Sequence, residues 1–110
     1  MNNHFRRIQD LKALHELLEQ STEKPVVIFK HSTTCPISAR AYEQMAELAD
    51  EVGLIDVQTG REISREIAKG TGVEHESPQV IIMRNGKPVW HTSHWDITRE
   101  TVEKALRENP

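Results

Sequence analysis

The only cysteine of the chain, Cys35, lies in the segment KHSTTCPISARAYEQ. A cysteine thiolate can attack a disulfide bond, so thiol–disulfide exchange is the first chemistry to consider at this position. Ser38 stands where a second cysteine would complete a C-x-x-C motif. The lone thiol can therefore take up one half of a mixed disulfide, but it cannot close an internal disulfide.

Cys35 follows a predicted buried strand and immediately precedes a predicted helix. The run VVIFK, residues 26–30, has no polar alternation, which is typical of a strand covered on both faces. Pro36 suits the first position of a helix, where its missing N–H costs nothing. The free N–H groups and the dipole at a helix start favour negative charge, and so favour the thiolate form of Cys35. Lys30 and His31 could add positive potential there, although a lysine in a strand can point elsewhere.

Hydroxyl groups precede the thiol, because Ser32, Thr33 and Thr34 lead directly into Cys35 and can donate hydrogen bonds nearby. The alternative is that Cys35 is a buried and inert residue, as free cysteines often are. An inert cysteine is more typical of an apolar run than of a segment of Ser, Thr and Pro. The surroundings therefore favour a reactive thiol.

Length, composition and charge indicate which classes of protein this chain can belong to. With 110 residues, of which 36% are hydrophobic and 28% charged, the chain has the size and balance of one globular domain, residues 1–110. A net charge of −3 without a basic stripe argues against a nucleic-acid partner. We recognise no apolar run of membrane-spanning length and no secretory signal, so we expect a cytoplasmic protein without a membrane partner.

Apolar residues at spacings of three and four predict four helices. Asp10 is a candidate N-cap for the first helix, and Thr98 can cap the fourth. Gly53 is expected to end the second helix, and Gly70 to lie past the end of the third. The segments that carry these patterns are residues 10–21, 37–52, 60–72 and 97–106.

The strand signals complete an α/β fold. The runs VVIFK and LIDVQ, residues 26–30 and 54–58, flank a helix, which predicts a parallel pair with a right-handed crossover. Asn85-Gly86 separates two β-rich runs and is the typical signature of a two-residue hairpin, because both turn residues adopt positive φ. We expect a small mixed sheet of about four strands with helices on both faces.

The combined motifs resemble a known family. TTCPIS at the start of a helix, with Ser77-Pro78 before a hairpin, resembles the thioredoxin-like superfamily, and the TTCP start is similar to that of the glutaredoxins. KHSTTCPISARA together with SPQVIIMRNGKPVWHTSHWDIT resembles the monothiol bacilliredoxins, found in bacteria that use bacillithiol as their small thiol. The resemblance covers nearly the whole chain and implies a thioredoxin-like three-layer α/β/α sandwich.

The resemblance also implies roles for individual residues. Cys35 maps to the family's nucleophile, Ser38 to the position of a resolving cysteine, and Pro78 to the cis-proline of the superfamily. The backbone of Ser77 would hold the incoming disulfide as a short antiparallel strand. The implied activity is removal of bacillithiol from mixed disulfides of bacillithiolated client proteins, with bacillithiol as co-substrate and no tightly bound cofactor. We expect a monomer.

The pairing of residues in the predicted hairpin places further residues beside the thiol site. A two-residue turn at Asn85-Gly86 pairs residues whose numbers sum to 171, which places Pro78 opposite Ser93. If Pro78 lies beside Cys35, residues 93–95 should lie there too, although Trp95 could equally be a core aromatic. The candidate substrate-binding residues are therefore Thr34, Pro36, Ser38, Ser77, Pro78, Ser93, His94 and Trp95.

Three other functions remain open at this point. A thioredoxin-like interaction domain would leave Cys35 unused. A peroxidase would use one activated cysteine, but no arginine is obviously placed to polarise a peroxide. A monothiol glutaredoxin could share an iron–sulfur cluster between two subunits. Binding of a metal ion by the scattered histidines is not expected, because no Cys/His pair has the spacing of metal ligands.

Overall fold

The computed structural model of the chain describes residues 4–110, which form a mixed sheet of five strands with helices on both faces. The strands are β1 (Phe5–Arg7), β2 (Val26–His31), β3 (Val52–Asp56), β4 (Gln79–Arg84) and β5 (Lys87–Ser93), and the helices are α1 (Leu11–Gln20), α2 (Pro36–Ala46), α3 (Arg61–Thr71) and α4 (Arg99–Glu108), with a short 3-10 helix, η1 (His94–Asp96). The strand order is β1-β3-β2-β4-β5. β1 and β2 run parallel to β3, whereas β4 is antiparallel to β2 and to β5.

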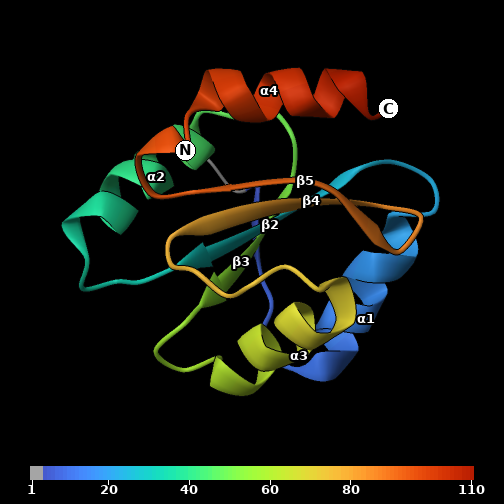
Figure 1. Cartoon of the computed structure of the whole chain (residues 1–110), viewed down its shortest axis with the longest axis horizontal. Coiled ribbons are helices and arrows are strands. Elements are labelled where there is room, and N and C mark those ends of the chain that lie inside the picture. Colours follow the sequence, from blue (N-terminus) through green and yellow to red (C-terminus); the bar gives the residue numbers. More distant parts are fainter. Residues whose placement is uncertain (1–3) are drawn as a thin grey trace.

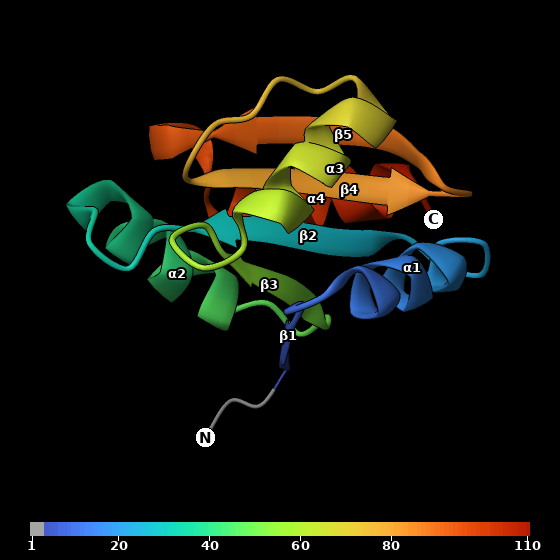
Figure 2. The same ribbon diagram turned by 90° about the horizontal axis from the view of Figure 1, so that it is seen from below.

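The elements form three layers, as the sequence predicts. Helices α2 and α4 cover one face of the sheet, and α1 and α3 cover the other (Figures 1 and 2). Within β2, Val27 and Phe29 belong to the core beneath α2 and α4, whereas Val26 and Ile28 belong to the core beneath α1 and α3. Successive side chains of a strand point to opposite faces, which explains why this run is apolar throughout.

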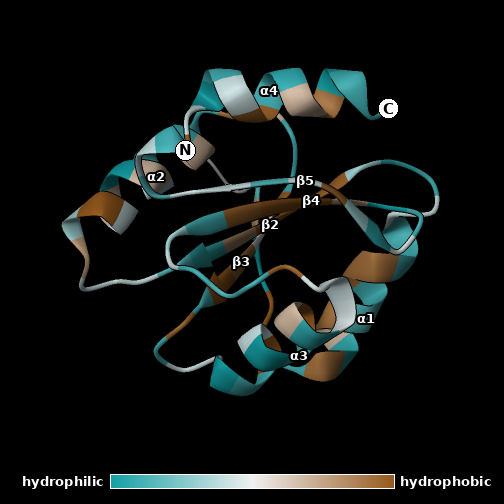
Figure 3. Cartoon of the chain, viewed as in Figure 1, coloured by the Kyte–Doolittle hydropathy of each residue, from teal (hydrophilic) through white to brown (hydrophobic). Residues whose placement is uncertain are grey.

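Polar residues cover the outside of the sandwich, and the apolar ones gather along the central strands and the inward helix surfaces (Figure 3). Among residues 4–110, no helix combines the length and the apolarity needed to span a membrane.

The predicted N-caps of two helices are confirmed. Asp10 accepts a hydrogen bond from the Ala13 N–H at 2.8 Å. Thr98 Oγ1 accepts from the Thr101 N–H at 3.1 Å, and the Thr98 N–H donates to Thr101 Oγ1 at 3.2 Å, so the two residues form a capping box. These contacts satisfy N–H groups that a helix start otherwise leaves without a partner.

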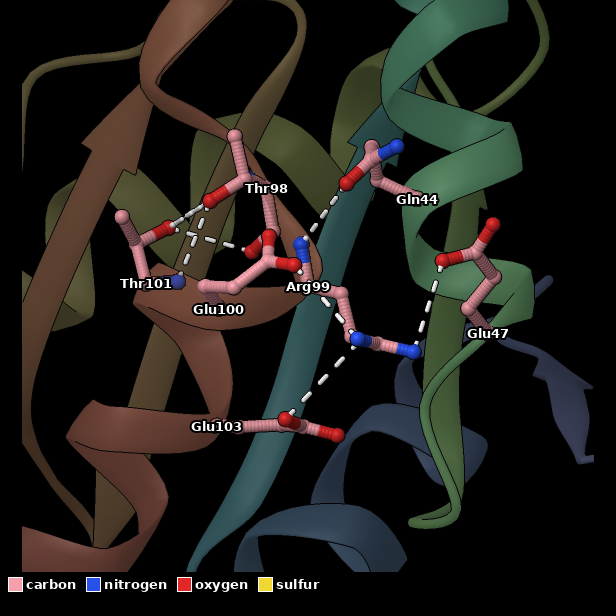
Figure 4. A network of polar contacts seen from close by, with 7 residues as sticks. All are labelled: Gln44, Glu47, Thr98, Arg99, Glu100, Thr101 and Glu103. Carbon is pink, nitrogen blue, oxygen red and sulfur yellow. Dashed lines mark hydrogen bonds and ion pairs between the residues drawn. The ribbon is translucent and has the colours of Figure 1, made fainter.

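The start of α4 is tied to α2 by Arg99 (Figure 4). Its backbone N–H donates to Gln44 Oε1 at 2.9 Å, and its guanidinium lies 3.8 Å from a carboxylate oxygen of Glu47. Because Gln44 and Glu47 belong to the C-terminal end of α2, these contacts fix the two helices of one layer against each other.

The predicted end of the second helix is wrong. α2 ends at Ala46 rather than near Gly53, and Gly53 lies inside β3. A Cβ atom at this position would lie 2.6 Å from Leu17 Cδ2 and 3.2 Å from the Val27 carbonyl oxygen. Glycine is therefore required by the close approach of α1 and β2 to β3, and not by a helix terminus. β3 begins at Val52, two residues before the predicted strand, because Val52 pairs with both neighbouring strands.

The third helix and the first strand also differ from the prediction. α3 continues through Gly70 to Thr71, and it is Gly72, with φ of 75°, that follows its last residue. β1 was not predicted, because three residues with a single apolar side chain carry no recognisable strand pattern. This strand adds the fifth member of the sheet through its pairing with β3.

Two alanine substitutions test these corrections. Gly53→Ala is expected to lower the free energy of unfolding by about 1–3 kcal/mol, because the added methyl group overpacks the space beside Leu17. Gly70→Ala is expected to raise it by about 0.5–1 kcal/mol, because no atom lies within contact range and alanine favours a helix interior. Denaturation in guanidinium chloride measures both. A neutral Gly53→Ala would contradict the close packing described here.

Candidate active site

Cys35 is the N-cap of α2, and Pro36 is the first helical residue, as predicted. The Cys35 backbone is extended, with φ of −106° and ψ of 123°, and its carbonyl oxygen accepts from the Ala39 N–H at 3.0 Å. Its side chain is unpaired with any other sulfur and lies partly exposed. The thiol thus lies at the start of a helix, and its side chain accepts no capping hydrogen bond from the first turn.

Ser38, one turn further along α2, is fully buried and holds the strand-to-helix connection in place. Its Oγ accepts from the Ser32 N–H at 2.8 Å and lies 2.7 Å from Nδ1 of His31. Burial lowers the pKa of His31, against smaller opposing effects of Asp56 and of the Ser38 hydrogen bond. The lowered pKa favours the neutral imidazole at pH 7, and its Nδ1 shares a hydrogen bond with the Ser38 hydroxyl.

Gln58 fixes the loop that carries the thiol, a role that the sequence pattern did not reveal. Its amide nitrogen donates to Ser32 Oγ at 2.9 Å and to Thr34 Oγ1 at 3.0 Å. Its amide oxygen accepts from the Thr33 N–H at 3.3 Å. Its position two residues after β3, at the edge where β2 also ends, is the one signal that could have pointed to it.

Pro78 lies at the same edge of the sheet as the thiol loop. β2 pairs with β4 so that Lys30 is opposite Gln79, which places Pro78 next to the end of β2. The Ser77–Pro78 peptide bond is cis, as the family resemblance implies. The Ser77 hydroxyl is buried and has no hydrogen-bond partner within the described part of the chain.

The hairpin turn is confirmed, but the predicted register is wrong by one residue at its far end. Asn85 and Gly86 have φ of 56° and 73°, as a type I′ turn requires. A β-bulge then leaves Val89 unpaired, so that Gln79 rather than Pro78 lies opposite Ser93. Pro88 precedes the bulge and has no N–H for the strand ladder, which accounts for the irregularity.

The residues after β5 still lie beside Pro78. The His94 N–H donates to the Pro78 carbonyl oxygen at 3.0 Å, and His94 itself has a positive φ of 55°. Trp95 is 61% exposed, so it is not a core aromatic. The Arg40 guanidinium lies 5.6 Å from its ring centroid, which joins Trp95 to the N-terminal half of α2.

Lys30 lies on the other face of the sheet and does not contribute to the thiol site. Its side chain is fully buried, and its Nζ lies 3.1 Å from Nδ1 of His75. Burial lowers the pKa of Lys30 from 10.5 to about 8. Burial also lowers the pKa of His75, and the charge of Lys30 lowers it further. Of the two basic residues that end β2, only His31 faces the layer of α2.

The fold and the lone thiol at the start of α2 define the class: this is a thioredoxin-fold oxidoreductase with a single sulfur at its site. Residues 6–102 match the family model described as Monothiol bacilliredoxin BrxC, and the chain belongs to this family. Its activity is accordingly that of a monothiol thiol–disulfide oxidoreductase, and the prediction from sequence is confirmed.

Solved structures agree with this assignment. A protein described as having a thioredoxin fold, and provisionally as an oxidoreductase, has 35% identity and a TM-score of 0.85, with 92% of each chain covered. The thioredoxin of Fasciola hepatica has 14% identity and a TM-score of 0.77, covering 96% of this chain and 99% of its own. The thioredoxin of Trypanosoma brucei brucei has 16% identity and a TM-score of 0.77, with 94% and 88% covered. The two thioredoxins show the fold alone.

Ser38→Cys is expected to form an internal disulfide with Cys35, because N-cap and third helical residue are spaced as in a C-x-x-C motif. After mild oxidation, the number of free thiols per chain should fall to zero, and no dimer should form. Ile37→Cys is the matched control, because residues two apart on a helix do not face each other. Intermolecular dimers alone from Ser38→Cys would contradict the placement of this side chain.

Trp95 should report on the state of the thiol. In a Trp90→Phe protein, Trp95 is the only tryptophan, and its emission should change when a small thiol is attached to Cys35. The reason is that η1 contacts α2 through Arg40, next to the first turn that carries the adduct. Trp95→Ala should also slow transfer several-fold. Unchanged fluorescence together with the parent rate would remove Trp95 from the site.

Proposed function

We propose that this protein removes bacillithiol from bacillithiolated client proteins through Cys35. The observation that carries the proposal is the single thiol at the N-cap of α2, with a buried serine where a resolving cysteine would stand. Such a site can exchange one sulfur at a time. It therefore suits removal of a small thiol better than reduction of a protein disulfide.

The reaction has two balanced steps. The Cys35 thiolate attacks the bacillithiol sulfur of the mixed disulfide, the old S–S bond breaks, and the client leaves as a thiolate that takes up a proton. The new Cys35–bacillithiol disulfide is then attacked by the thiolate of a second bacillithiol. This step releases oxidised bacillithiol and regenerates the Cys35 thiolate. Bacillithiol is thus a co-substrate, and no tightly bound cofactor is required.

We assign the binding of the mixed disulfide to the segments that border Cys35. The backbone of Ser77, beside the cis Pro78, offers a short edge for an extended client segment. On the other side, Ser93, His94 and the exposed Trp95 form a rim against α2. The remaining contacts come from Thr34 and Pro36 beside the thiol, whereas the fully buried Ser38 supports this loop from beneath without touching the ligand.

The proposal includes the setting in which this chemistry operates. The chain acts as a single domain of residues 1–110 and as a monomer, in the cytoplasm. There the clients are proteins whose thiols have been modified by bacillithiol. The single free cysteine supports this setting, because a thiol of this kind persists in a reducing compartment.

The intact mass of the protein after exposure to bacillithiol disulfide, and separately to glutathione disulfide, tests the proposal. We expect one bacillithiol adduct per chain, formed faster than the glutathione adduct and absent from Cys35→Ser. Preferential glutathione addition would overturn the choice of small thiol while leaving monothiol exchange in place. If neither adduct forms, the proposed role of Cys35 fails.

A further inference from the structure

A second candidate site lies on the other face of the sheet from α2. Helix α3 and the segment that leads into β4 both lie on this side of the sheet (Figures 1 and 2). A cleft of about 410 Å³ is lined by residues of both. A volume of this order is within the ~300–1,000 Å³ range of small-molecule sites. The cleft is lined by Val57, Arg61, Ser64, Arg65, Ala68 and His75, none of which belongs to the thiol site.

The charge of the lining is positive. Arg61 and Arg65 are one helical turn apart on α3 and both are exposed, and none of the ion pairs within residues 4–110 involves either guanidinium. His75 forms the facing wall, with the buried Lys30 behind it at 3.1 Å from Nδ1. No acidic side chain lines the cleft. Against the larger effect of burial, the nearby carboxylate of Glu76 raises the pKa of His75, but it does not line the cleft. Its Oε1 lies 3.7 Å from Nδ1 of His94.

Ser64 supplies an unused hydrogen-bond donor in the same wall. Its side chain is 6% exposed, and its Oγ has no hydrogen-bond partner in the part of the chain that the structure describes. A buried hydroxyl normally finds a partner, so an unpaired one beside a cleft indicates a missing acceptor. Val57 and Ala68 provide apolar surface next to it.

We propose that this cleft binds a small organic dianion. Arg61 and Arg65 each present the planar fork of N–H groups that pairs with a carboxylate or a phosphate, and their one-turn separation suits two negative charges on one ligand. The Ser64 hydroxyl lies just beneath the cleft surface, and rotation of its side chain towards the cleft lets it donate to one ligand oxygen. The carbon skeleton of the ligand lies against Val57 and Ala68. The proposal is independent of the function assigned to Cys35, because the two sites share no residue.

The test is an NMR titration of the full chain carrying Cys35→Ser, so that no thiol chemistry interferes. Succinate and inorganic phosphate are the two probes, and the neutral succinamide is the control ligand. We expect saturable shifts of the amide signals of Val57, Ser64, Arg65 and His75 with a dianion, and none with succinamide. Tighter binding of succinate indicates a dicarboxylate ligand, and tighter binding of phosphate indicates a phosphate ester.

Substitutions locate the binding. Arg61→Gln and Arg65→Gln should each weaken the affinity about 10-fold, because each removes a charge-assisted pair. Lys69→Gln is the matched control, since it removes one positive charge from an exposed position of the same helix that does not line the cleft. Two results would overturn the proposal. One is a titration in which the amide shifts do not saturate below about 10 mM of either dianion, which would mean an affinity weaker than that of a millimolar site. The other is equal weakening by Lys69→Gln, which would mean unspecific attraction.

Discussion

Replacing Cys35 with serine should abolish the removal of a small thiol from a mixed disulfide, with a loss of about a thousandfold or more. The serine hydroxyl stays protonated at neutral pH, and the chain contains no other cysteine that could take over. Release of bacillithiol from a bacillithiolated client protein gives the rate.

The matched control is Thr33→Ala, which removes an exposed hydroxyl two residues earlier in the same loop. The loop uses the Thr33 backbone N–H as the donor to Gln58, and this bond survives the substitution. We expect the Thr33→Ala protein to react at nearly the parent rate. Turnover by Cys35→Ser above about a hundredth of the parent rate would show that a group other than this thiol carries the reaction.

The parts of the fold that could be predicted are those whose signal is local. The Asp10 and Thr98 caps, the Asn85-Gly86 turn and the buried strand of residues 26–30 each depend on a few consecutive residues, and all are confirmed. The order of these elements was then enough to give the mixed sheet and its three layers.

The errors share a non-local cause. Leu48 and Val52 continue the apolar spacing of α2, yet the helix ends at Ala46 because Val52 pairs with two strands from elsewhere in the chain. The role of Gly53 depends on α1, and β1 exists only because β3 offers an edge. Such features follow from tertiary packing, which local propensity does not contain.

The residues of the candidate site also fall into two groups, those that a local motif predicts and those that depend on tertiary contacts. Cys35 and Pro78 stand in motifs that can be read along the chain, so their positions followed from the sequence. Gln58 acts on the thiol loop from 24 to 26 residues away, through contacts that only the folded chain makes. The one-residue shift of Ser93 depends on a bulge near Pro88, and the exposure of Trp95 depends on where η1 meets α2.

Lys30→Met is expected to stabilise the protein at pH 7 by about 2 kcal/mol. Lys30 is fully buried, and its one described polar contact is Nδ1 of His75. Burial lowers its pKa from 10.5 to about 8, so at pH 7 the folded protein carries a charged ammonium group at a cost in free energy. Methionine fills a similar volume and removes that cost.

The dependence of stability on pH shows the direction of the Lys30 effect. Below pH 8 the lysine is protonated in both states, and the cost of its burial is fully present. Between pH 8 and 10.5 the unfolded chain binds more protons than the folded protein, so the stability of the parent rises with pH. The advantage of Lys30→Met should therefore shrink towards pH 10, as measured by guanidinium chloride denaturation at both pH values.

His75 gives a second readout of the same substitution. The charge of Lys30 contributes to the lowered pKa of His75, so this pKa should rise in Lys30→Met, which NMR of the imidazole can follow. Lys104→Met is the matched control, because Lys104 is exposed on α4, and it should change neither stability nor the His75 titration. Two outcomes would contradict this prediction. One is a Lys30→Met protein that is less stable than the parent at pH 7. The other is a stability difference that is the same at pH 7 and pH 10. Either would show that the pairing of Lys30 with His75 stabilises the fold.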